Sequence, residues 1–108
     1  MAVPPPSLGD FEQLVLLALV RLKDDAYGIP IHDEIARRAR RDVSLGAVYK
    51  TLDRLEQKGF VASVVGEPTA ERGGRRKKYF RIQPAGLRAL RHAISSLQRM
   101  AEGLVLEP

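Results

Sequence analysis

The sequence predicts a mainly helical α+β fold, a winged helix-turn-helix with an N-terminal helix and a C-terminal dimerisation helix. Two amphipathic helical patterns lie about three or four residues apart, which is the spacing of a helix-turn-helix. Two short β-rich segments then surround a glycine-rich loop, and a final helix repeats its apolar residues with a period of about 3.5. These observations divide the 108 residues into an N-terminal arm (1–7), a DNA-binding domain (8–83), a dimerisation helix (84–104) and a tail (105–108).

Composition places the chain among soluble globular proteins. Hydrophobic residues make up 44% and charged residues 29% of the sequence. The longest apolar run, residues 14–20, is too short to cross a bilayer, and acids rather than bases precede it. The absence of cysteine excludes disulfides and thiolate zinc sites. We therefore expect a cytoplasmic protein that is not associated with a membrane.

Positive charge is concentrated in the middle of the chain. Residues 37–81 hold thirteen Lys or Arg and five Asp or Glu, whereas residues 1–30 hold two and four. The net charge of the whole chain is +5. A segment with this charge favours an anionic partner.

The first helix is expected over residues 9–22, after an arm with three successive prolines that is predicted to be disordered. Ser7 is expected to cap it, and Asp10, three residues later, favours a helix N-terminus. Residues 14–20 are apolar without interruption, which predicts burial on more than one side. The second side is covered either by the same chain or by a partner subunit.

A polar loop (23–27) leads into a second helix over residues 29–40, with Pro30 in its first turn. Ile31, Ile35 and Ala39 form its inner face. Its basic end, RRAR followed by Arg41, has two interpretations: bases that suit a helix C-terminus, or contacts to a DNA backbone.

Residues 44–59 form the helix around which the chain is organised. Ser44 caps it and Gly59 stops it. Its back is apolar at Leu45, Val48, Leu52 and Leu55. Its front is small, polar or basic and holds no acid: Ala47, Lys50, Thr51, Arg54 and Lys58. Such a front fits a DNA major groove, and the alternative is an ordinary helix with a solvated face.

A β-hairpin is predicted after Gly59, with strands at residues 60–65 and 78–82 around a loop at 66–74. Residues 72–81 hold six bases and no acid. The hairpin then forms a wing that contacts phosphates or the minor groove, unless the loop only improves solubility. The candidate DNA-binding residues of the wing are Arg72, Arg75, Arg76, Lys77 and Lys78.

The last helix, residues 84–103, carries an apolar seam with spacings of 3, 4, 3, 4 and 3 residues, which is typical of helix-on-helix packing. The seam consists of Leu87, Leu90, Ile94, Leu97, Ala101 and Leu104. It predicts a homodimer built from this helix and the first one, although the seam could also pack on its own domain. A small hydrophobic effector is expected between the first helix and the partner's last helix, with the candidate lining residues Phe11, Val15, Ala93 and Met100.

Four segments in this order resemble the PadR family of bacterial transcriptional regulators: LGDFEQLVLLAL, AYGIPIHDEI, VSLGAVYKTLDRLEQKGFV, and RGGRRKKYFRI followed by PAGLRAL. The resemblance covers residues 8–100 and implies a winged helix-turn-helix, a homodimer, and repression relieved by a small ligand or signal. It places Ser44, Tyr49, Lys50 and Arg54 on the DNA-facing helix and residues 75–78 on the wing. Tyr49 lies at the edge of the apolar arc, so we expect its ring to join the core while its hydroxyl reaches a phosphate.

Two positions depart from the family pattern. Lys50 stands where a proline often follows the tyrosine, and Gln83 stands where a threonine commonly caps the last helix. The first change bears on base preference and the second on cap stability.

The predicted partners are double-stranded DNA with an inverted-repeat operator and a second copy of the chain. No catalytic residues, cofactor or metal are expected, because His32 and His92 each fall within a predicted helix. Asp33 and Glu34 beside His32 would allow acid–base chemistry or a metal, but a polar helix start explains them. The alternative function is a winged-helix protein-interaction module that does not bind DNA. The basic front of residues 44–58 and the basic wing are the features that favour DNA binding over this alternative.

Overall fold

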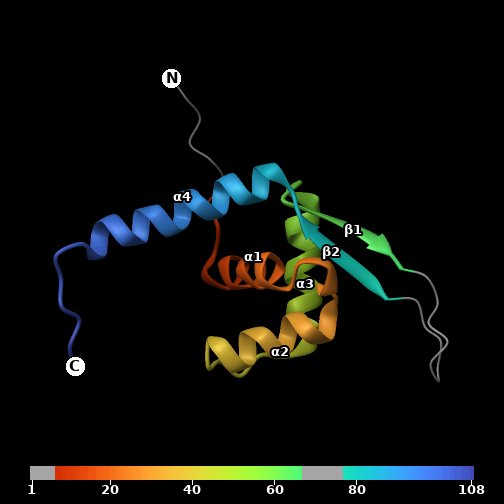
Figure 1. Cartoon of the computed structure of the whole chain (residues 1–108), viewed down its shortest axis with the longest axis horizontal. Helices are drawn as coiled ribbons and strands as arrows, with labels where there is room; N and C mark the ends of the chain where they lie inside the picture. Colours follow the sequence, from red (N-terminus) through yellow and green to blue (C-terminus); the bar gives the residue numbers. More distant parts are fainter. Residues whose placement is uncertain (1–6, 67–76) are drawn as a thin grey trace.

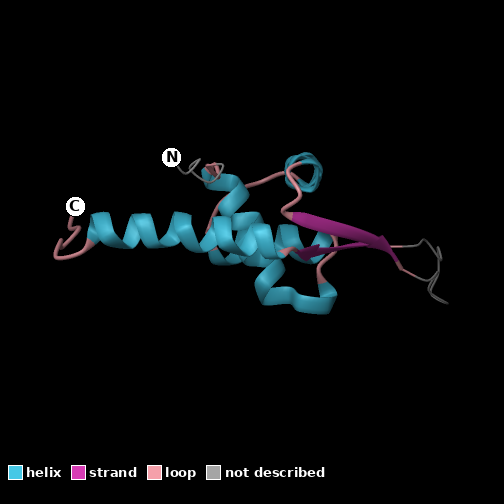
Figure 2. Cartoon of the chain, turned by 90° about the horizontal axis from the view of Figure 1, so that it is seen from above, coloured by secondary structure: helices cyan, strands magenta, loops and turns pink. Residues whose placement is uncertain are grey.

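A computed structural model describes residues 7–66 and 77–108. Its helices are α1 (Asp10–Leu22), the short 3-10 helix η1 (Lys23–Asp25), α2 (Gly28–Arg38), α3 (Leu45–Gln57) and α4 (Pro84–Ala101). The strands β1 (Val61–Val65) and β2 (Lys78–Ile82) pair in an antiparallel hairpin. The helices α1, α2 and α3 pack together, the hairpin projects from one side, and α4 extends past the other side (Figures 1 and 2). This arrangement confirms the mainly helical winged helix-turn-helix.

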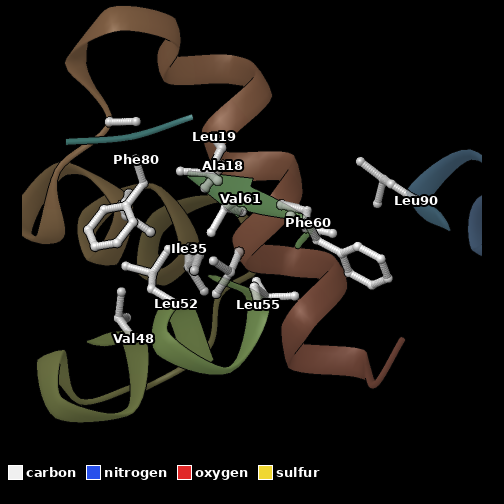
Figure 3. Packing of buried hydrophobic residues seen from close by; sticks show 14 of the residues in the cluster. Ala18, Leu19, Ile35, Val48, Leu52, Leu55, Phe60, Val61, Phe80 and Leu90 are labelled. Atoms are coloured by element: carbon white, nitrogen blue, oxygen red, sulfur yellow. The ribbon is translucent and has the colours of Figure 1, made fainter. Parts of the chain in front are cut away.

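Helix α1 lies at the centre of the core and contacts α2, α3, α4 and β2. Val15 and Leu16 of α1 are completely buried, as are Ile31 of α2 and Leu52 of α3. Figure 3 shows side chains of α1, α3, the hairpin and α4 converging on one cluster. The apolar run of α1 is therefore covered on several sides by its own chain, except at Val20, which is 42% exposed.

The start of α1 differs from the prediction. Gly9, and not Ser7, is the N-cap, and the Glu12 carboxylate accepts a 2.8 Å hydrogen bond from the Gly9 backbone N–H. Glu12 thus supplies one half of a capping box and satisfies a donor that the helix leaves unpaired. Asp10 is the first residue of the helix, where its negative charge interacts favourably with the helix dipole.

The end of α3 is a Schellman motif. The Gly59 N–H donates to the Glu56 carbonyl at 3.0 Å and the Phe60 N–H to the Leu55 carbonyl at 2.9 Å. Gly59 adopts φ +77°, a left-handed conformation that favours glycine, and the side chains of Leu55 and Phe60 are both buried. Gly59 therefore ends α3 as predicted and turns the chain directly into β1.

The segment before α2 is more ordered than the predicted polar loop. Residues 23–25 form η1, and Tyr27 then makes an isolated β-bridge to Tyr79 of β2. The Phe80 N–H also donates to the Ala26 carbonyl at 2.8 Å. These bonds attach the entrance of α2 to the hairpin, so the position of β2 is coupled to that of the helix-turn-helix.

The predicted apolar seam of α4 divides into two parts. Leu90 is only 3% exposed and packs in the core of its own chain, and Ile94 packs against that core. Leu97 and Met100 are 62% and 79% exposed, and Leu104 lies beyond the end of the helix at Ala101. Assigning Leu90 and Leu104 to one continuous helical dimer seam was therefore wrong. The exposed part is the distal half of α4, which extends away from the other helices (Figure 1).

Gly86 allows α4 to lie against the backbone of Phe60. A Cβ atom at Gly86 would come within 2.3 Å of the Phe60 carbonyl oxygen, which also accepts a 2.8 Å hydrogen bond from the Gln83 N–H. Backbone atoms cannot give way as a flexible side chain can. We expect Gly86→Ala to lower the free energy of unfolding by about 1–3 kcal/mol.

Gly46→Ala is the matched control in urea or thermal unfolding, because the nearest atom to its added Cβ would be 4.0 Å away. Alanine is the better helix former, so this variant should gain up to about 1 kcal/mol. Equal stability of the two variants would show that the contact between α4 and Phe60 is not tight.

Candidate nucleic-acid interface

The start of α3 is fixed by its cap. Ser44 is the N-cap, and its hydroxyl accepts a 3.0 Å hydrogen bond from the Ala47 N–H. This bond satisfies one of the free donors of the first turn and fixes where the helix begins. In this structure the hydroxyl of Ser44 therefore orients α3.

The exposed face of α3 is rotated relative to the predicted front. Thr51, assigned to the DNA-facing front, is only 6% exposed and lies on the core side, whereas Leu45, assigned to the apolar back, is exposed. Asp53 is exposed on the same side of the helix as Lys50 and Arg54. Thr51 is thus removed from the candidate DNA-contacting residues, and the exposed face contains an acid that the prediction left at its flank.

Lys50 and Arg54 are the exposed bases of this face. Within residues 7–66 and 77–108, neither side chain forms an ion pair or hydrogen bond with another residue. Both are exposed, on the second and third turns of α3, and the charge of Arg54 also acts on Glu12. Their donors are consequently available to an anionic ligand.

Lys58, at the C-cap of α3, has a structural partner instead. Its Nζ donates to Oε2 of Glu12 at 2.7 Å, which joins the end of α3 to the start of α1. Burial acts to raise the pKa of Glu12, but it is outweighed by the hydrogen bonds from Lys58 and the Gly9 N–H and by the positive charges of Lys58 and Arg54. The pKa of Glu12 therefore lies below its ordinary 4.5. Lys58, which was predicted on the DNA-facing front, is thus exposed but paired with Glu12 within the protein.

We expect Lys58→Met to lower the free energy of unfolding by about 1–3 kcal/mol at neutral pH, because it leaves a buried carboxylate without its charged donor. A carboxyl group with a lowered pKa stabilises the fold above its ordinary pKa of 4.5, and this contribution is lost as the pH falls through the lower folded value. The difference between wild type and variant should thus shrink below about pH 4.5. Lys50→Met, which removes an exposed lysine of the same helix, is the control and should change stability little at either pH.

Tyr49 joins α3 to the first residue of α2. Its side chain is exposed, yet a Cβ at Gly28 would lie 2.1 Å from the Tyr49 hydroxyl oxygen. The phenol therefore lies directly on the Gly28 backbone, and any larger residue at 28 would displace it. The prediction that the Tyr49 ring joins the core was therefore wrong: the ring covers the N-terminus of α2 at the protein surface.

An aromatic and basic cluster lies at the far end of the hairpin, where Val65 pairs with Lys78. The Tyr27 and Tyr79 rings meet edge to face with centroids 5.5 Å apart, and the Lys77 ammonium lies 4.6 Å from the Tyr27 centroid. Lys78 is exposed and lies 3.9 Å from a carboxylate oxygen of Glu56. Arg72, Arg75 and Arg76 of the predicted wing lie outside the described residues.

The basic end of α2 is engaged within the protein. Arg37 and Arg38 both bond to Glu34 one turn earlier, and Arg41 bonds to Asp10 of α1 at 2.6 Å. These pairs favour the interpretation of the arginines as bases at a helix C-terminus. Arg38 and then Arg37 also hold the pKa of Glu34 below its ordinary value, against the opposing effect of burial.

One of the four residues predicted to line an effector pocket cannot have that role. Val15 is completely buried in the core of its own chain, so it cannot line a cavity shared with a partner, whereas Phe11 and Ala93 are half-buried and Met100 is exposed. A different cavity, of about 210 Å³, lies between α1 and α2 and is lined by Leu14, Leu17, Ala18, Arg21, Glu34, Ile35, Arg38 and Ala39.

The described residues form neither a metal site nor a membrane-spanning helix. Over residues 7–66 and 77–108, no three His, Asp or Glu side chains gather in a way that could hold a metal ion. Within the same ranges, no helix has the length and apolar character needed to span a bilayer. The side chains of His32 and Glu34 bond to other parts of the protein, His32 to the Val43 carbonyl and Glu34 to two arginines.

Solved structures share this fold. A PadR-like transcription factor from Bacteroides fragilis superposes with a TM-score of 0.70 at 23% identity, over 85% of this chain and 84% of the other. A PadR family transcriptional regulator from Eggerthella lenta gives a TM-score of 0.65 at 28% identity, over 84% and 77% of the two chains. A transcriptional regulator from Clostridium thermocellum gives 0.69 at 24% identity, over 84% and 85%. No curated protein is detectably similar in sequence.

The family model of the PadR-like transcriptional regulators matches residues 16–92, from the middle of α1 into α4. This range includes the whole helix-turn-helix, the hairpin and the first half of α4, which make up more than half of the chain. The chain therefore belongs to the PadR-like family of transcriptional regulators.

Proposed function

We propose that this regulator binds operator DNA as a dimer, with α3 in the major groove and the hairpin against the backbone. The observation that carries the proposal is the exposed face of α3, where Lys50 and Arg54 have no ion pair with another described residue. Membership in the family makes the chain a transcriptional regulator and not an enzyme. An exposed basic helix at the second position of a helix-turn-helix fits the major groove in width and in charge.

The two groups of bases have different roles in this proposal. Lys50 and Arg54 belong to a rigid helix and reach base edges, where arginine or lysine recognises guanine. Lys77 and Lys78 lie at the far end of the hairpin and meet phosphates, which add affinity without sequence information. Asp53, beside them on α3, would accept a hydrogen bond from a cytosine amino group and would be repelled by a phosphate.

Dimerisation is proposed through the distal half of α4. Leu97 and Met100 are large apolar side chains that α4 leaves exposed, and Ile94 continues the same stripe toward the core. Leu104, Val105 and Leu106 extend the exposed apolar surface beyond the helix. A two-fold dimer would place two α3 helices about one DNA turn apart, so the operator would be an inverted repeat.

Repression relieved by a small ligand is the regulatory mode that the family resemblance implies. Repression by occupancy requires only operator binding, which α3 and the far end of the hairpin would supply. A ligand relieves it only to the extent that it binds the free dimer more tightly than the DNA-bound one. Phe11, Ala93 and Met100 would line such a ligand site between α1 and the partner's α4. A ligand complex with the density at the hairpin instead would contradict this location.

Selection of bound sites from random duplex DNA tests the proposal directly. We expect an inverted repeat to be enriched and the affinity for it to fall steeply with salt, since phosphate contacts release counterions. The competing function, a winged-helix protein-interaction module, predicts no enrichment and no salt-dependent retention on DNA or heparin. That result would refute DNA binding.

A further inference from the structure

His32 connects α2 to the segment that leads into α3. Its Nε2 lies 2.8 Å from the Val43 carbonyl oxygen, and its Nδ1 lies 3.0 Å from Oδ1 of Asp33. Val43 immediately precedes Ser44, the residue that caps α3. One imidazole therefore bridges the two helices of the helix-turn-helix at the point where the chain enters α3.

Both partners of this ring are acceptors. A backbone carbonyl cannot donate, and an ionised carboxylate cannot either, so each ring nitrogen must carry a proton for both bonds to form. A neutral imidazole has one N–H and can satisfy only one partner, whereas the imidazolium satisfies both. Hydrogen bonds from the charged ring are also the stronger ones. The geometry thus fits the protonated form of His32.

The charges around the ring act in the same direction. In the described part of the chain, the charged groups that act on the imidazole are Asp33, from α2, and Asp42, from the segment between α2 and α3. The hydrogen bond to Asp33, and after it the bond to Val43, raises the pKa of His32 above its ordinary 6.5 against a smaller opposing effect of burial. The negative charges of Asp33 and Asp42 raise it further.

We propose that protonated His32 is a positioning residue for DNA binding, which holds Val43 and the Ser44 cap so that α3 is presented to the operator. His32 acts through α3 and need not touch DNA. The proposal rests on the proposed function, because it assigns a pH dependence to the same DNA-binding surface. In this proposal α3 is held in its DNA-binding orientation when His32 is protonated.

The direction of the effect follows from linkage. A group whose pKa is higher in the ordered state stabilises that state fully below its ordinary pKa of 6.5, and the contribution is lost as the pH rises through the higher folded value. Ordering of α3, and with it operator affinity, should thus be greatest in mild acid. The loss should occur above about pH 6.5, within the range where histidine is the usual titrating side chain.

The experiment measures operator affinity from about pH 6 to about pH 8.5 for four proteins. They are the wild type, His32→Gln, Asp33→Asn and His92→Gln. His92 is the other histidine of the sequence and is exposed on α4, which makes it the matched control. The same proteins without DNA are followed by NMR, which reports the imidazole titration and the amide shifts of Val43 and Ser44.

We expect wild type and His92→Gln to lose about fivefold or more in operator affinity with rising pH, at the midpoint of the His32 titration. His32→Gln should show a flat profile at the level that wild type reaches at high pH. Asp33→Asn removes the negative charge beside the ring and should move the midpoint to lower pH. The Val43 and Ser44 amides should titrate with the ring in wild type and in His92→Gln.

Three results would overturn the proposal. An unchanged pH profile in His32→Gln would show that another group titrates. A salt slope that changes by about one with protonation would make His32 a phosphate contact, not a positioning residue. If the amide shifts of Val43 and Ser44 stayed constant while the His32 ring titrates, the bridge would not control the start of α3. A chain that binds no DNA at any pH refutes the proposed function itself, whereas pH-independent operator binding refutes only the role of His32.

Discussion

Leu97→Glu is expected to convert the proposed dimer into a folded monomer. Leu97 is 62% exposed within its own chain, so a glutamate there leaves the core around α1 intact. In a dimer formed through the distal half of α4, the new carboxylate would be buried without a partner at the cost of several kcal/mol. Two-fold symmetry places the same charge on both sides of the interface, so the cost occurs twice.

Sedimentation and unfolding measurements together check this expectation. The variant should sediment as a monomer and should keep the helical content and most of the stability of a folded chain. Gln98→Glu is the matched control, because it introduces the same side chain at the next exposed position of α4. A Leu97→Glu protein that remains a stable dimer would show that the interface lies elsewhere.

Arg54→Ala is expected to weaken binding to the operator far more than binding to random DNA. A bidentate contact from arginine to a base edge is worth about 1–3 kcal/mol of discrimination, and a dimer would make the contact in both half-sites. Random duplex offers the same phosphates but not the same base edges, so its affinity should change little. The ratio of the two affinities, measured at one salt concentration, is the quantity to compare.

Arg76→Ala combined with Lys77→Ala is the comparison variant, since these bases belong to the basic hairpin segment in the sequence. Loss of two phosphate contacts in each subunit of the dimer should weaken operator and random DNA alike and lower the salt slope by about four. Should this variant lose specificity while Arg54→Ala retains it, the assignment of α3 as reader and the hairpin as backbone contact is reversed.

The sequence by itself determined the elements and their order. Ser44 and Gly59 set the ends of α3 through local bonds, the cap to Ala47 and the left-handed turn into Phe60, and such bonds depend on residues a few positions apart. The strands of the hairpin follow in the same way from short β-branched segments around a loop. The family assignment also depends on residues in order along the chain.

Only the tertiary structure decided which faces these elements bury. Apolar spacing fixes an arc of a helix to within about one residue, so it could not show that Thr51 is buried and Asp53 exposed. Likewise, the regular spacing of the apolar residues of α4 did not reveal that Leu90 joins the core of its own chain while Leu97 stays exposed. Which part of α4 is buried depends on the close approach of Gly86 to the Phe60 backbone. The acceptor for Nε2 of His32 is the carbonyl oxygen of Val43, eleven residues along the chain. Contacts of this kind are created by packing between elements, and no local pattern encodes them.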